Sequence, residues 1–134
     1  MTAARGVVVA GGTGALGRAL VELLLEQGDR VAVPFRSRAG FDRLRTSLPA
    51  ADGLWGEQAD IATIAGARTF LEAAAAALGG LEAVAIVSGA YAGAGPLGET
   101  PEDEWRAMMS ANLETAHAVC RGALPTWASG AAAW

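Results

Sequence analysis

The stretch from Val7 to Arg18 constrains the fold more than any other part of the chain. Residues 7–10 are three valines and an alanine, which predict a buried strand. Glycines follow at positions 11, 12, 14 and 17, and a helical pattern of leucines begins after Ala15. A strand, a glycine turn and a helix N-terminus can together bind a pyrophosphate, because backbone N–H groups and the helix dipole favour an anion there. The motif alone is weak evidence, since such glycines can also serve close packing.

The remainder of the chain alternates strands with helices. We expect strands over 7–10, 30–35, 54–58 and 81–87, and helices over 15–26, 41–47, 62–78 and from Thr100 to about Leu124, where Pro125 ends the last one. This alternation predicts an α/β, Rossmann-like, doubly wound parallel sheet of four strands in the order 3-2-1-4. Residues 1–134 then form a single, partial dinucleotide-binding domain, with the fourth strand buried on both faces. The ligand would lie at the carboxyl ends of the strands, near the switch between strands one and four.

Composition excludes several classes of function. The net charge of −4 does not favour nucleic acid or an anionic membrane surface. All ten basic residues are arginines, so no mechanism that needs a lysine is available within the chain. Cys120 is the only cysteine, which suits the reducing cytoplasm, and we expect it to be a small core residue. His117 has no second ligand at metal spacing, and no stretch is typical of a signal peptide or a membrane span.

Several segments in order resemble the N-terminal half of the short-chain dehydrogenase/reductase family, over roughly residues 6–125. The turn Ala10-Gly11-Gly12-Thr13-Gly14-Ala15-Leu16-Gly17 resembles the cofactor loop of the family. The resemblance implies that the cofactor-binding residues of this loop are Gly11, Thr13, Gly14, Leu16 and Gly17. Glycine spacing leaves the branch of the family open, because Ala15 replaces a glycine of the single-domain branch.

Three later segments extend the resemblance. Asp60, followed by Ile61, resembles the acidic residue that contacts adenine, although an aspartate before a helix can also serve only as a turn or cap residue. Ser88 and Gly89 resemble the end of the Asn-Asn-Ala-Gly motif of the family, in a chain that has Ile86 and Val87 before them. Asn112 resembles the active-site asparagine on the following helix.

The resemblance stops before the catalytic tyrosine and lysine of the family. The only tyrosine is Tyr91, and the residue four positions later is Gly95 rather than a lysine. Asn112 would then be the residual member of a proton relay, or a purely structural residue. We therefore expect a cofactor-binding half that is inactive alone. The alternatives are a non-catalytic dinucleotide sensor or interaction protein, or an enzyme completed by a second chain.

The residues after the second strand favour NADP(H) over NAD(H). NAD-binding proteins of this fold place an acid there to bind the ribose 2′-hydroxyl, whereas this chain has Arg36 and Ser37. An arginine fits a 2′-phosphate through charge-assisted hydrogen bonds, and Arg38 could assist. The competing interpretation is a solvated loop arginine.

The sequence also predicts self-association. A chain whose sheet stops after the fourth strand leaves that strand as an open apolar edge, which favours pairing with another chain. We expect a homo-oligomer through the last helix and the exposed fourth strand.

Overall fold

The computed structural model describes residues 3–93 and 95–128 of the 134-residue chain. Its strands are β1 (Gly6–Ala10), β2 (Arg30–Phe35), β3 (Leu54–Gln58) and β4 (Ala83–Ile86). The helices are α1 (Ala15–Glu26), α2 (Arg38–Ser47), α3 (Ile64–Leu78), the 3-10 helix η1 (Leu97–Glu99), α4 (Glu102–Met109), the π-helix η2 (Ser110–Glu114) and α5 (Thr115–Ala128). All strand pairs are parallel, and the order β3-β2-β1-β4 confirms the predicted sheet.

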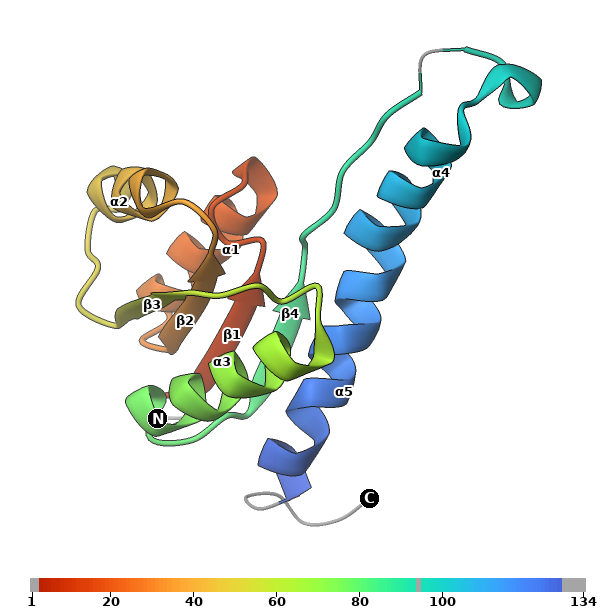
Figure 1. Cartoon of the computed structure of the whole chain (residues 1–134). Helices are drawn as coiled ribbons and strands as arrows, with labels where there is room; N and C mark the ends of the chain where they lie inside the picture. Colours follow the sequence, from red (N-terminus) through yellow and green to blue (C-terminus); the bar gives the residue numbers. More distant parts are fainter. Residues whose placement is uncertain (1–2, 94, 129–134) are drawn as a thin grey trace.

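Helices cover both faces of the sheet, as Figure 1 shows. On one face, alternate residues of β1 and β2 pack against α1 and α2, with Val9, Val33 and Phe41 in the core. On the other face, Val8 and Ala32 pack against α3 and α5, where Phe70 is fully buried. Because successive side chains of a strand point to opposite faces, β1 supplies both cores and is buried along its whole length.

Helix α2 begins earlier and helix α3 later than the sequence pattern predicts, because capping side chains set their first turns. The Ser37 hydroxyl oxygen accepts a hydrogen bond from the Gly40 backbone N–H, so α2 begins at Arg38 rather than at residue 41. The Thr63 hydroxyl oxygen accepts from the Gly66 N–H, so α3 begins at Ile64 rather than at residue 62.

The last helix differs from the prediction at both ends. Pro101, and not Thr100, is the N-cap residue of α4, and the Thr100 hydroxyl instead donates to the Pro96 carbonyl. Pro125 lies inside α5, so the prediction that the helix ends there is wrong. Trp127 packs against the core beside α3, and this contact retains the last turn beyond the proline.

Two burial predictions are also wrong. β4 is partly exposed along its length, because β1 covers one of its edges and no other described strand pairs with it. Cys120 is exposed on α5 instead of buried in the core.

A buried carboxylate fixes the start of β1 to the end of α1. The Arg5 guanidinium donates to both carboxylate oxygens of Asp29, at 3.1 and 2.6 Å, and the Arg5 backbone N–H donates to the same group. The hydrogen bond from Arg5 lowers the pKa of Asp29, although burial acts in the opposite direction.

Among the helices of residues 3–93 and 95–128, none is long and apolar enough to cross a bilayer.

Candidate functional site

The glycine turn after β1 is shaped by contacts that exclude larger residues. Gly11 has a φ of +92°, and a Cβ added there would lie 2.5 Å from the Ser88 backbone nitrogen at the end of β4. A Cβ at Gly17 would overlap the Gly11 carbonyl oxygen. The turn therefore lies close to the ends of both central strands and to the first turn of α1, which needs glycine at these two positions.

The N-terminus of α1 is open to a ligand. Gly14 is the N-cap residue and provides no side-chain hydrogen bond to the first turn of the helix. The first N–H groups of a helix have no acceptor within it, so they can bind an anion, which the helix dipole also favours. This end of α1 lies at the carboxyl ends of β1 and β2, on the same side of the sheet as the start of α2.

A cleft with a volume of about 460 Å³ crosses the carboxyl ends of β1, β2 and β4. Its lining comes from the glycine turn, the end of β2 with the start of α2, the segments after β3 and β4, and η2 with α5: Gly11, Thr13, Gly14, Pro34, Phe35, Arg36, Ser37, Gly40, Arg43, Ala59, Ile61, Val87, Ser88, Gly89, Ala90, Ala111 and Thr115. Two of these residues are arginines, and no carboxylate is among the lining residues in the described part of the chain.

Arg36 and Ser37 lie at the end of the cleft beyond β2. The Arg36 backbone carbonyl accepts a hydrogen bond from the Gln58 side chain at 3.0 Å, while its guanidinium has no partner among the described residues. Arg36 also lines a neighbouring hollow with Gln58, Ala59 and Asp60. The Ser37 hydroxyl already caps α2, and it lies in the cleft as well.

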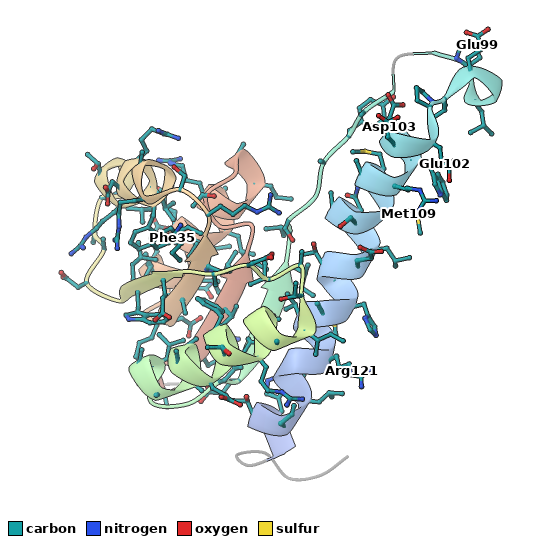
Figure 2. The ribbon with its side chains drawn as sticks, in the orientation of Figure 1. Phe35, Glu99, Glu102, Asp103, Met109 and Arg121 are labelled. Carbon is teal, nitrogen blue, oxygen red and sulfur yellow. The ribbon has the colours of Figure 1, made fainter. Side chains whose placement is uncertain are left out.

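Arg38 does not lie where the sequence suggests. The Arg38 guanidinium stacks over the Phe35 ring, 4.9 Å from its centroid, and Arg38 does not line the cleft. Phe35, labelled in Figure 2, in turn stacks on Phe41 of α2. Arg43, which the sequence analysis missed, lines the cleft instead. It falls one turn into α2, so only the helix geometry could have indicated it.

Asp60 and Ile61 occupy the segment after β3. The Asp60 carboxylate accepts a hydrogen bond from the Ala62 backbone N–H at 3.1 Å, which is the geometry of a turn aspartate. Its second carboxylate oxygen has no hydrogen-bond partner in the described chain, so Asp60 can serve both the turn and a ligand in the hollow beside Arg36. Ile61 lines the main cleft.

Ser88 and Gly89 follow β4 and line the opposite end of the cleft. The Ser88 Oγ atom is buried and has no hydrogen-bond partner in the described residues. A buried hydroxyl without a partner loses its hydrogen bonds to water, so a polar ligand atom beside it would be favourable. A Cβ at Gly89 would lie 2.5 Å from Asn112 Oδ1, so a larger residue here would displace the Asn112 side chain.

Asn112 lies outside the lining of the cleft, within η2. Its side-chain amide donates to the carbonyls of Ala90 and Met108, both at 2.9 Å, and its oxygen accepts from the Ala90 N–H at 3.3 Å. All of these partners are backbone groups. Asn112 therefore fixes the segment after β4 against the helix, and Ala90, which it holds, lines the cleft.

Leu16 and Gly17 do not line the cleft either. Leu16, in the first turn of α1, has 69% of its surface exposed, whereas Gly17 is buried beneath the turn. Tyr91 is 89% exposed. Within the described residues, no group of three or more histidine, cysteine or acidic side chains could hold a metal ion.

Comparisons with known proteins agree with this architecture. The sequence profile described as short chain dehydrogenase matches residues 5–133. A short-chain dehydrogenase/reductase (glucose/ribitol dehydrogenase) from Brucella melitensis is similar in structure, with 27% identity, a TM-score of 0.79, and alignment over 91% of this chain and 51% of its own. A short-chain type dehydrogenase/reductase from Mycobacterium ulcerans has 22% identity and a TM-score of 0.85, over 94% of this chain and 47% of its own.

A third structure, a tyrosine-to-phenylalanine variant of ElxO with NADPH bound, has 16% identity and a TM-score of 0.87, over 95% of this chain and 52% of its own. The chain thus spans about half the length of these structures. Among curated proteins, the sequence comparison finds no match.

Proposed function

This chain belongs to the short chain dehydrogenase family, and from that premise we propose that its cleft binds a nicotinamide dinucleotide, with NADP(H) preferred over NAD(H). The cleft fits such a cofactor on three observations. Gly11 and Gly14 line the turn without a Cβ atom, α1 begins without a side-chain cap, and the buried Ser88 hydroxyl lacks a partner. The glycines allow a phosphate to approach the backbone closely, and the uncapped start of α1 favours an anion. The Ser88 hydroxyl favours a polar group of the ligand beside it.

The proposed contacts follow the cleft from one end to the other. Gly11, Thr13 and Gly14 line the cleft and hold the pyrophosphate end, while Leu16 and Gly17 lie outside the lining, in the adjoining first turn of α1. Arg36 and Ser37 hold the 2′-phosphate. Asp60, in the neighbouring hollow, and Ile61 contact the adenine, and Ser88 and Gly89 lie on the nicotinamide side. When bound, the cofactor supplies or accepts a hydride. Asn112 positions the segment after β4 through backbone hydrogen bonds and does not touch the cofactor.

The observation that carries the NADP(H) preference is the charge of the lining. It contains two arginines and, among the described residues, no carboxylate, in a chain with a net charge of −4. An acid that would accept a bond from the ribose 2′-hydroxyl is missing from the end of β2, and a guanidinium occupies that end instead.

The test is calorimetric titration of the 134-residue chain with NADPH and with NADH. We expect NADPH to bind at least about tenfold more tightly, because one charge-assisted contact to a phosphate contributes roughly 1.5 kcal/mol or more. Arg36→Ala should remove most of this difference and leave NADH binding unchanged, whereas Arg121→Ala, on the exposed side of α5, should change neither. Equal affinities for the two nucleotides in the unsubstituted chain would contradict the preference.

We further propose that these 134 residues do not turn the cofactor over without another chain. They contain no lysine, and Tyr91 is exposed in the segment after β4 with no charged group paired to it in the described structure. A general base has to lie within hydrogen-bond reach of the proton that it removes, and Tyr91 does not line the cleft. Sustained NADPH oxidation by the purified chain with a panel of carbonyl compounds would contradict this proposal.

A further inference from the structure

Arg43 lies over the start of α2, on the wall of the cleft. One terminal nitrogen of its guanidinium is 3.8 Å from the position that a Cβ on Gly40 would take, and that position is 3.9 Å from the Ser37 hydroxyl oxygen. The guanidinium therefore turns back from the second turn of α2 toward the first. Its charge therefore lies near Ser37 and Gly40, which line the same cleft as Arg36.

Several arginines of the described structure interact with a neighbour, and among those that do not, only Arg36 and Arg43 line the cleft. Arg5 pairs with Asp29, Arg18 with Glu22 and Arg106 with Glu102, while Arg38 stacks on Phe35. Neither Arg43 nor Arg36 has a hydrogen bond or ion pair from its guanidinium within residues 3–93 and 95–128. Two unpaired positive charges in one cleft repel each other, and a dianion between them would remove that repulsion.

We propose that Arg43 is a second residue that selects NADP(H) over NAD(H), by binding the 2′-phosphate together with Arg36. This inference rests on the proposed function, since it assumes that the cleft holds the dinucleotide. It replaces Arg38, which the sequence indicated as the assisting residue, because the Phe35 ring already engages the Arg38 guanidinium. The N-terminal end of α2 adds a favourable dipole at the same place.

Four variants in the 134-residue chain test the assignment by calorimetry with NADPH and NADH. Arg43→Ala should weaken NADPH binding about tenfold, the effect of one charge-assisted contact, and leave NADH binding unchanged. Arg43→Lys should retain part of the NADPH affinity, because it keeps the charge but loses the forked donor geometry. Arg45→Ala and Arg38→Ala remove the same charge from α2 outside the cleft, and each should change NADPH binding less than about twofold.

The outcomes separate this inference from the proposed function. If the unsubstituted chain binds neither nucleotide, both the proposed function and the role of Arg43 are refuted. If Arg36→Ala weakens NADPH binding but Arg43→Ala behaves like Arg45→Ala, the proposed function stands and the role of Arg43 is refuted. If Arg43→Ala loses equal affinity for NADPH and NADH, the side chain contacts a part of the cofactor that both nucleotides share. That result also refutes a role of Arg43 in binding the 2′-phosphate. Arg43→Gln, which keeps the polar side chain and removes the charge, repeats the test if the alanine variant melts below the assay temperature.

Discussion

At the residue scale, two glycines of the same turn have different physical reasons to be glycine. A Cβ at Gly17 would overlap the Gly11 carbonyl oxygen, which is backbone and cannot rotate away. A Cβ at Gly14 would meet the same oxygen at 3.4 Å, an ordinary contact, and Gly14 has a φ of −81° that any residue can adopt. Gly17 therefore determines how closely α1 approaches β1, whereas Gly14 leaves room at the mouth of the cleft.

We expect Gly17→Ala to lower the free energy of unfolding by about 1–3 kcal/mol, as overpacking in a close-packed site does. Gly14→Ala, in the same turn, should lower it by less, at most about 1 kcal/mol, because alanine is a poorer N-cap residue than glycine but meets no steric overlap there. Chemical denaturation measures both. Equal stabilities of the two variants would show that the turn can move away from α1.

The Arg5–Asp29 pair predicts how stability depends on pH. Asp29 is only 6% exposed, and hydrogen bonds from Arg5 lower its pKa in the folded state. The folded protein thus binds this proton less readily than the unfolded chain. The stabilisation is present above the unfolded pKa of about 3.9, and it is lost as the pH falls through the folded pKa.

Asp29→Asn should therefore lower the Tm at neutral pH, and the difference from the unsubstituted chain should shrink below about pH 4. The control is Asp52→Asn, at an exposed carboxylate whose side chain makes no described hydrogen bond or ion pair. Thermal melts followed by circular dichroism across this range measure the effect. A Tm difference for Asp29→Asn that stays constant down to pH 3 would contradict the linkage.

At the element scale, α4, η2 and α5 form one continuous helical rod that projects beyond the sheet (Figure 1). Glu102 and Asp103 lie in its first turn, far from the strands (Figure 2), where acidic residues suit the helix dipole. The chain leaving β4 runs back along this rod and is attached to it by the Asn112 amide and by the Met108 sulfur, which accepts from the Ala92 N–H. The segment after β4, which lines the cleft at Ala90, is thus attached to the rod at the end of α4 and in the π-helical turn η2.

We expect Asn112→Ala to release the segment after β4, because three hydrogen bonds to backbone groups are lost together. Hydrogen–deuterium exchange should show faster exchange of the Ala90 N–H, which bonds to Asn112 alone. Leu113→Ala is the control within the same turn, since Leu113 is 58% exposed. Unchanged protection in Asn112→Ala would mean that packing, and not this side chain, holds the segment.

At the scale of the whole molecule, the sheet has an unpaired edge at β4, which pairs only with β1 among the described strands and packs against α5. The rod beside it exposes large apolar residues, with Trp105 at 56% and Leu113 at 58%. An open parallel edge next to exposed apolar side chains favours association with another copy of the chain.

We therefore expect sedimentation velocity to show species larger than a monomer, with a concentration-dependent distribution. Leu113→Glu should shift this distribution toward the monomer, because it places a charge on the proposed contact. Leu23→Glu, a matched change at an exposed leucine of α1, should leave it unchanged. A chain that stays monomeric at every concentration would contradict the proposed association.

Local sequence signals determined the elements and their order. The valine run of β1, the glycine turn and the alternation of strands with helices were sufficient for the parallel sheet β3-β2-β1-β4, since each signal acts between near neighbours. The bounds of α1, β2 and β3 agree with the prediction for the same reason. The predicted glycine turn, Arg36 and Ser88 come together in one cleft, because carboxyl ends of parallel strands share an edge.

Only the tertiary structure decided what depends on neighbours distant in the sequence. It turned Arg38 onto Phe35 and Arg43 into the cleft, kept α5 helical past Pro125 by packing Trp127, and left β4 partly exposed. The physical reason is that a side chain's charge and propensity are local properties. Its partner, its burial and the face that it presents are set by elements that meet only after the chain has folded.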